Sequence, residues 1–207
     1  MRDRILEAAV RVYGAHGFRG ATTKRIAAAA GVNEVTLFRT FGSKAALIDA
    51  AIRNRADRDG VAGLPVTPAD PIAELTAFAT AAHAHMRKMR SMIRKCMSEM
   101  EERPAMSDAA CEGPTWAHHQ LREYIVRLQA LRLASSDVDP MVASSMLMSS
   151  LFADAMGRDL MPSIYPTPAS AAAEQYVRLV ARALGISVTA RATKRASAAR
   201  AGSSPTT

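Results

Sequence analysis

The sequence has few of the residues on which secreted, membrane and cofactor-binding proteins depend. Only two cysteines, Cys96 and Cys111, occur in 207 residues, and they lack a C-x-x-C spacing. This excludes a disulfide framework and suits a reducing compartment, so we expect a cytoplasmic protein. No stretch reaches the roughly 18 consecutive apolar residues of a membrane-spanning helix. We therefore expect no membrane partner.

Catalytic motifs are also missing. The sequence contains no glycine-rich phosphate loop, no nucleophile elbow and no pair of carboxylates in a recognisable context. Two histidine pairs, His83-x-His85 and His118-His119, lack the i, i+4 spacing with which H-E-x-x-H binds zinc. We therefore expect that the protein is not an enzyme and that it binds neither a metal nor a cofactor. A metal sensor that combines the second pair with a cysteine is an alternative, which zinc in the purified protein would favour.

The positive charge of the chain, +8 overall, is unevenly distributed. Residues 1–60 carry a net charge of +5 and residues 186–207 a net charge of +4, whereas the segment between them is nearly neutral. A basic unit beside a neutral one fits a nucleic-acid-binding domain attached to a separate sensing body. A basic surface that is merely solvated is the competing interpretation of the charge alone.

Apolar residues recur at helical spacing along most of the chain, and no segment alternates with period two, so we predict an all-α fold. Residues 59–71 contain two glycines and three prolines and should separate two domains. We expect a DNA-binding domain with its linking helix at 1–58, a helical ligand-binding and dimerisation domain at 59–185, and a disordered basic tail at 186–207. The expected helices span 2–16, 24–30, 34–41, 44–58, 72–85, 86–102, 115–134, 139–161 and 169–184.

The most informative stretch is residues 22–47. A helix capped by Thr22 or Thr23 should end at Gly31, in the left-handed conformation that glycine favours. Asn33 should cap a second helix, Glu34–Phe41, and Ser43 a third that begins at Lys44. Two helices joined by a short glycine-containing turn form a helix-turn-helix, whose second helix enters the DNA major groove.

The same stretch resembles the DNA-binding domain of the TetR (tetracycline repressor) family, through the pattern T-x-x-x-I-A-x-x-A-G-V followed by L-F-x-x-F-x-S-K-x-x-L. This resemblance covers roughly the first quarter of the chain. It implies a three-helix DNA-binding domain, a helical body that binds a small molecule, and a homodimer on a palindromic operator. The matching residues are Thr22, Ile26, Ala27, Ala30, Gly31, Val32, Leu37, Phe38, Phe41, Ser43, Lys44 and Leu47.

The second helix of the motif should read the base edges. Arg39 is the best candidate for a bidentate contact with guanine, and Val35 or Thr36 for contact with a thymine methyl group. Glu34 either accepts a hydrogen bond from a cytosine amine or favours the helix N-terminus, and we prefer the second interpretation. Phe38 should line the DNA backbone or flank a base.

Phosphate contacts are implied by the resemblance. It places them at Thr23 and Lys44, each at the start of a helix. Thr40 departs from the histidine or larger aromatic residue that many family members carry, which makes a phosphate contact there less secure. The complete set of expected DNA-binding residues is Thr23, Asn33, Glu34, Val35, Thr36, Phe38, Arg39, Thr40 and Lys44.

Methionine is concentrated in the second domain, where eleven of the twelve methionines lie between Met86 and Met161. Methionine adapts to varied apolar ligands, although any single methionine is more often ordinary core. Together with nearby aromatic residues they suggest an apolar cavity between helices. The residues expected to line it are Met86, Met89, Met97, Met100, Trp116, Tyr124 and Phe152.

The last two helices are the expected dimer surface. Helix 139–161 is rich in small residues that allow close helix approach, and helix 169–184 adds an apolar stripe. The sequence therefore predicts a regulator, most simply a repressor, that a small apolar molecule releases from its operator. The alternative within DNA-binding proteins is a ligand-independent architectural protein. The small residues are Ala143, Ser144, Ser145, Ser149, Ser150 and Ala153.

Overall fold

The structure is a computed structural model that describes residues 1–58, 63–104 and 106–186. Within these ranges all regular secondary structure is helical, so the predicted all-α fold is confirmed. None of the described helices is both long and apolar enough to span a bilayer. The expected tail lies outside the described residues except for Ile186, which is buried in the body rather than projecting from it.

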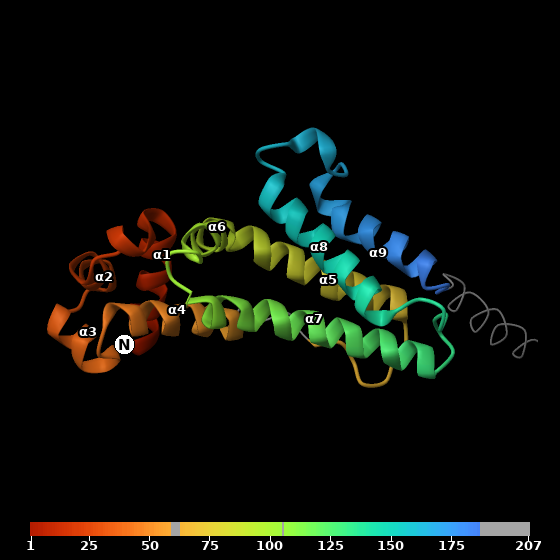
Figure 1. Cartoon of the computed structure of the whole chain (residues 1–207), viewed down its shortest axis with the longest axis horizontal. Coiled ribbons are helices and arrows are strands. Elements are labelled where there is room, and N and C mark those ends of the chain that lie inside the picture. The colour runs from red at the N-terminus through yellow and green to blue at the C-terminus, as the bar shows by residue number, and fades with distance from the viewer. Residues whose placement is uncertain (59–62, 105, 187–207) are drawn as a thin grey trace, which may run out of the picture.

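The first three helices form a compact unit at one end of an elongated molecule (Figure 1). They are α1 (Arg2–Gly20), α2 (Thr23–Ala30) and α3 (Glu34–Phe41), and α4 (Lys44–Arg58) leads from them toward the body. Helix α1 is interrupted at Gly17, whose φ of 64° lies in the left-handed region. The expected end of the first helix at residue 16 is thus confirmed. We also expected His16 to lie on the apolar stripe of this helix with Ile5 and Ala9, and this is wrong, because His16 is exposed. Tyr13 is buried instead.

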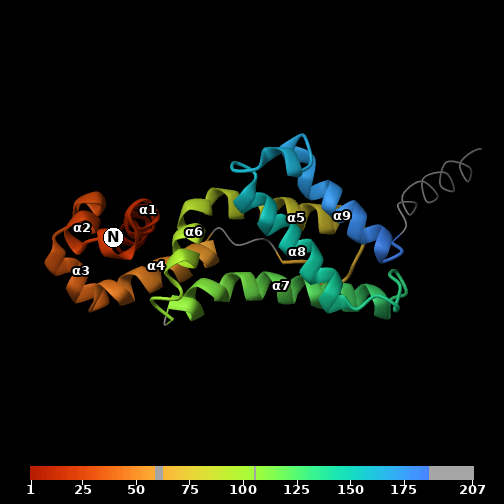
Figure 2. The same ribbon diagram turned by 45° about the horizontal axis from the view of Figure 1, so that its top comes forward.

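The body contains α5 (Pro71–Lys88), α6 (Arg90–Glu99), α7 (Met106–Ala130), α8 (Pro140–Gly157) and α9 (Ala172–Ala183). Two short 3₁₀ turns, η1 (Pro162–Ile164) and η2 (Ala169–Ala171), join the last two helices. Figures 1 and 2 show α5, α7, α8 and α9 running lengthwise, with α6 placed between them and the first unit.

Several predicted helix boundaries in the body are wrong. The expected helix 86–102 breaks at Met89, which ends α5 and precedes α6. Helix α7 begins at Met106 and continues through Pro114, where we expected an interruption. Its first turns bury Ala109 against the first unit, and this packing favours helix despite the proline. Helix α8 ends at Gly157, four residues earlier than expected.

Two hydrophobic cores support the fold. One fills the body between α5, α7, α8 and α9, with Leu121, Ile125 and Leu151 fully buried. The other lies between α1, α2, α3 and α4, and it also includes Met92 and Cys96 of α6 and Ala109 of α7. Packing therefore crosses the domain boundary that we propose near residue 58.

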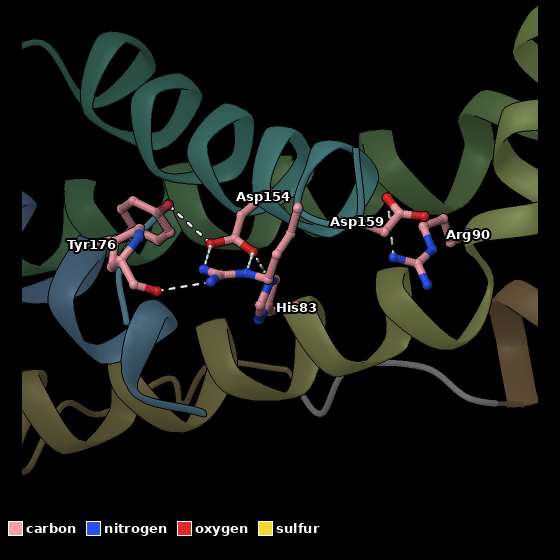
Figure 3. Close-up of polar contacts among 7 residues, drawn as sticks. His83, Arg90, Asp154, Asp159 and Tyr176 are labelled. Atoms are coloured by element: carbon pink, nitrogen blue, oxygen red, sulfur yellow. Dashed lines mark hydrogen bonds and ion pairs between the residues drawn. The ribbon is translucent and has the colours of Figure 1, made fainter. Parts of the chain in front are cut away.

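A buried polar cluster ties three helices of the body together (Figure 3). Asp154 of α8 is completely buried. It accepts hydrogen bonds from Tyr176 of α9 at 3.0 Å and from Arg158, and its Oδ1 lies 3.0 Å from His83 Nε2 of α5. Arg158 also donates to the carbonyl of Pro166, at 2.8 Å, and so holds the segment that follows α8.

The cluster sets the charge of its members. Burial lowers the pKa of His83 and outweighs the opposing influence of the Asp154 carboxylate, so His83 is neutral. Although burial alone raises the pKa of Asp154, hydrogen bonds from Arg158 and Tyr176 prevail and lower it, so Asp154 is ionised. Removing one partner would leave a buried charge or dipole uncompensated.

These pKa directions predict a loss of stability on mild acidification. Because the folded-state pKa of His83 is below its unfolded value of about 6.5, the unfolded chain binds more protons as the pH falls below that value. Asp154 keeps its own contribution down to its unfolded pKa of about 3.9 and loses it only as the pH falls from there through its lowered folded-state pKa. The free energy of unfolding should therefore fall between pH 7.5 and 5.5, by up to about 1.4 kcal/mol per pH unit.

His83→Gln separates this effect from other titrations. Glutamine keeps an amide donor close to the position of Nε2 but does not titrate. In urea denaturation at pH 7.5 and 5.5, we expect a smaller difference between the two pH values for this variant than for the wild type. Equal differences would contradict the assignment to His83.

Candidate nucleic-acid interface

The turn between α2 and α3 has the geometry that the sequence predicts. The Thr22 hydroxyl accepts a hydrogen bond from Arg25 N at 3.3 Å, and Asn33 Oδ1 accepts one from Val35 N at 2.9 Å. Gly31 adopts φ 62° and ψ 44°, the left-handed conformation at a helix C-terminus. Asn33 therefore caps α3, and this role is independent of any contact with DNA.

Burial then fixes which face of α3 points outward. Ile26, Ala30 and Leu37 are buried together in the core, and Phe41 packs against it. The opposite side of α3 therefore faces solvent, where Val35 is 70% and Phe38 is 50% exposed. Exposed apolar side chains at the end of a basic unit fit a surface that contacts another molecule.

Arg39 and Thr40 are both exposed on α3, but they differ in whether their hydrogen-bond donors are already used within the chain. Among the described residues Arg39 has no hydrogen-bond or ion-pair partner, so its guanidinium group is available to a ligand. Thr40 instead donates its hydroxyl proton to the carbonyl of Thr36 at 2.7 Å. This bond occupies the hydroxyl donor of Thr40, the residue at which the sequence pattern is least secure.

The two expected phosphate-contacting residues have partners within the chain. The Thr23 hydroxyl donates to Glu34 Oε2 at 2.7 Å, which joins the first turns of α2 and α3. Lys44 Nζ donates to the carbonyl of Phe18 at 2.9 Å and lies 4.1 Å from the centre of the Phe18 ring. The Glu34 carboxylate is thus held at the N-terminus of α3, where the helix dipole favours it.

A second candidate site is a cavity of about 730 Å³ in the body. Helices α4, α5, α6, α7 and α8 all contribute to its wall. Six of the seven expected residues line it: Met86, Met89, Met97, Met100, Trp116 and Phe152. Tyr124 does not, because it is fully buried in the body core and donates to Glu74. The helical periodicity of α7 gave no means of separating core from cavity at that position.

Few polar groups interrupt the cavity wall. Arg53 of α4 and Glu112 of α7 form an exposed ion pair, with Arg53 Nε 3.1 Å from a carboxylate oxygen, and both residues line the cavity. His85 and the two cysteines also border it. The described residues contain no group of three or more potential metal ligands. The His118 imidazole is instead 3.0 Å from the hydroxyl of Ser145.

Sequence reasoning missed the residues that connect the cavity to the first unit. Glu99, at the end of α6, accepts a hydrogen bond from the Tyr13 hydroxyl at 3.0 Å and another from Phe18 N at 2.8 Å. Glu99 is one of three acidic residues between 99 and 102, so no pattern distinguishes it from its neighbours. Arg94 and Asp159, which join α6 to α8, were missed for the same reason.

Comparisons with known proteins agree with this geometry. Residues 5–51 match the model of "Bacterial regulatory proteins, tetR family". Over 57 residues the chain is 40% identical to an uncharacterised HTH-type transcriptional regulator, YvkB, of Bacillus subtilis (strain 168), a match that covers 28% of this chain and 30% of that protein.

Solved structures extend the similarity of fold to most of the chain. A putative TetR-family transcriptional regulator from Rhodococcus sp. superposes with a TM-score of 0.71 over 90% of this chain and 98% of its own, at 19% identity. The flavonoid-responsive regulator FrrA gives a TM-score of 0.67 over 88% of this chain and 95% of its own, at 24% identity. At these identities the likeness establishes the fold alone.

The helix-turn-helix unit and the match over residues 5–51 identify an N-terminal DNA-binding domain of the tetR-family type, and the fold of the chain as a whole is similar to that of solved TetR-family regulators.

The turn geometry predicts how Gly31 tolerates substitution. A Cβ atom at this position would meet nothing within 4 Å, so backbone strain alone decides the cost. Gly31→Ala should lower the free energy of unfolding by about 1–2 kcal/mol, whereas Gly31→Asn should cost less because asparagine visits the left-handed region more readily. Urea denaturation of both variants checks the order. Equal losses would show that the left-handed conformation does not set the cost.

Proposed function

We propose that this protein is a ligand-responsive transcriptional repressor. It binds a palindromic operator as a homodimer and leaves the operator when a small, largely apolar molecule enters the cavity. The observation that carries the proposal is the position of α4. This helix begins at Lys44, directly after the recognition helix, and its residues Ile52 and Arg53 line the cavity.

The outward face of α3 supports the DNA-binding part of the proposal. Arg39 is the base-reading residue because its side chain is exposed and its guanidinium group carries five N–H donors. Two of these donors can bond at once to the two acceptors of a guanine edge. Val35 and Phe38 supply apolar contacts to thymine methyl groups or sugars. Thr36 and Thr40 line the DNA major groove. Thr40 acts there chiefly through steric fit, because its hydroxyl donor is already bonded to the carbonyl of Thr36.

The phosphate contacts of the proposal require one internal bond to be exchanged and one to be kept. Thr23 and Lys44 lie at helix N-termini, where backbone N–H groups favour an anion. Their side chains currently contact Glu34 and Phe18. In the complex a phosphate oxygen replaces Glu34 as the acceptor of Thr23, whereas the Lys44 ammonium group, which has three N–H donors, keeps the Phe18 carbonyl and donates to a phosphate oxygen as well. Asn33 adds a contact beside the α3 N-terminus.

The chemistry of the cavity supports an apolar effector. Most of its wall consists of methionine, alanine and aromatic side chains, and a volume of about 730 Å³ suits a small molecule. The flavonoid-responsive regulator FrrA shares this fold, which is therefore compatible with a response to a small molecule. A ligand-independent architectural protein is the alternative, and it offers no role for this cavity.

The outer faces of α8 and α9 support the homodimer. Val142 and Met146 of α8 are 53% and 59% exposed, and Leu179 of α9 is 64% exposed. Not all of the expected small residues take part, since Ala143 and Ser144 face the core of their own subunit. Ser149 and Ala153 continue the exposed stripe at helical spacing. A two-fold dimer on this surface matches a palindromic operator, and we place the protein in the cytoplasm with that DNA.

The DNA-binding proposal is tested by selecting bound sequences from a random DNA pool and then measuring two variants against them. Arg39→Ala should lose about 1–3 kcal/mol of discrimination at one base position in each half-site. Lys44→Ala should weaken binding to all sequences alike and reduce the slope of affinity against salt by about one.

Arg122→Ala is the matched control, because it removes a partly exposed cation of the body that pairs with Glu123, and it should change neither property. The assignment of Arg39 fails if both test variants lose affinity equally for every sequence. Failure to enrich any palindrome would contradict the dimeric repressor itself.

The dimer surface makes a separate prediction. Met146→Glu places a charge in the centre of the exposed stripe and should dissociate the dimer, because an unpaired charge in an apolar interface is costly. Val126→Glu, on α7, is the matched control, since Val126 is also exposed, at 43%, but lies outside the proposed interface. Analytical ultracentrifugation should show monomers only for the first variant. Dimers in both would place the interface elsewhere.

A further inference from the structure

Helix α6 is short, and its two ends make polar contacts with different helices, α8 near its start and α1 at its end. It begins after the break at Met89 and ends at Glu99. Between these points Ile93, Cys96 and Met97 line the cavity, so one face of α6 forms part of its wall. An occupant of the cavity therefore presses directly on this helix.

At its C-terminal end, α6 holds the end of α1 through Glu99. One carboxylate oxygen accepts the Tyr13 hydroxyl proton at 3.0 Å, and the other accepts Phe18 N at 2.8 Å. Burial raises the pKa of Tyr13, so its hydroxyl stays a donor. A Cβ atom at Gly17 would lie 2.5 Å from Glu99 Oε1, so the close approach of the carboxylate depends on glycine there.

The residue that Glu99 holds is also the residue that positions Lys44. The N–H group of Phe18 donates a hydrogen bond to Glu99 at 2.8 Å, and the carbonyl of Phe18 accepts one from Lys44 at 2.9 Å. Its ring lies beneath the Lys44 ammonium group. A continuous chain of contacts thus runs from the end of α6, through one residue of α1, to the first residue of α4.

The first half of α6 contacts the end of α8 through ion pairs. Asp159, which follows α8, lies 2.6 Å from Arg94 and 3.4 Å from Arg90, and Figure 3 shows its carboxylate facing α6. Arg94 also donates to the carbonyl of Met156. These contacts anchor α6 to the body, so displacement by an occupant is transmitted toward the Glu99 end.

We infer that Glu99 is the positioning residue through which an occupant of the cavity alters Lys44 and lowers DNA affinity. This inference rests on the proposed function, because it assigns the route of a response that the proposal assumes. An occupant that displaces Cys96 and Met97 shifts Glu99, which then releases Phe18 N and the Tyr13 hydroxyl. The carbonyl of Phe18 moves with its residue, and Lys44 loses the geometry that presents it to phosphate.

A covalent probe tests this route without knowledge of the natural effector. Cys111 lines the cavity and is exposed, whereas Cys96 is buried with a raised pKa, so N-phenylmaleimide should label Cys111 selectively. The measured quantity is the ratio of DNA dissociation constants with and without the label, for the sequence enriched from the random pool. Cys111→Ser shows whether the effect depends on labelling at this site.

Labelling should weaken DNA binding by the wild type about ten-fold or more and by Glu99→Ala less than about two-fold. Glu102→Ala is the matched control, since Glu102 joins the same segments through an exposed ion pair with Arg19 at 3.6 Å, and it should respond like the wild type. Glu99→Gln retains only one acceptor oxygen and should give an intermediate ratio. It also replaces Glu99→Ala if circular dichroism shows that the alanine variant does not fold.

The possible outcomes separate the inference from the proposed function. Equal weakening in the wild type and in both Glu99 variants would overturn the role of Glu99 but leave the ligand response intact. No weakening in the labelled wild type would contradict the coupling between cavity and DNA, and the inference with it. A loss of response in Glu102→Ala as well would show that the whole junction, and not Glu99, carries the effect.

Discussion

The packing of α1 is the constraint on which the rest of the structure depends. One helix must bury Ile5, Leu6 and Tyr13 simultaneously against the DNA-binding unit, the linking helix α4 and the cavity helix α6. Because interiors are close-packed, these neighbours cannot shift independently of each other. The proposed DNA-facing surface and the cavity are therefore built on a single hydrophobic core, although the first lies in a basic segment and most of the second in a nearly neutral one.

This shared core gives the polar contacts at the junction their significance. A hydrogen bond between two parts that move independently would fix little. Here Glu99 joins helices that are already packed together, so its two directional hydrogen bonds add to apolar contacts that are themselves non-directional. The buried Asp154 cluster likewise joins α5, α8 and α9, close in sequence to Met156 and Asp159, which contact α6.

The sequence was a reliable guide wherever local chemistry decides the structure. Thr22, Asn33 and Ser43 cap the helices that their positions predicted, and Gly31 takes the left-handed conformation. The outward face of α3 followed from the burial of Leu37. Boundaries failed where packing overrides local preference, as at Pro114 inside α7 and at the break after α5.

The partners of polar side chains were beyond sequence reasoning for a different reason. Tyr124 and Trp116 both fit the apolar face of α7, yet one is core and the other borders the cavity. Similarly, Glu99 and Glu102 are alike in sequence, but only Glu99 lies beside Tyr13 and Phe18. These distinctions depend on contacts between residues 50 to 86 positions apart, which periodicity along one helix does not encode.

The central claim is that the cavity and the DNA surface are thermodynamically coupled, and reciprocity tests it most directly. The measurement is the affinity of a neutral apolar fluorescent dye, such as Nile red, for the cavity in the presence and absence of the selected DNA. Specific DNA should weaken dye binding by the same factor by which the dye weakens DNA binding, whereas a scrambled duplex should have little effect. Dye affinity that is unchanged by the specific DNA would contradict the account.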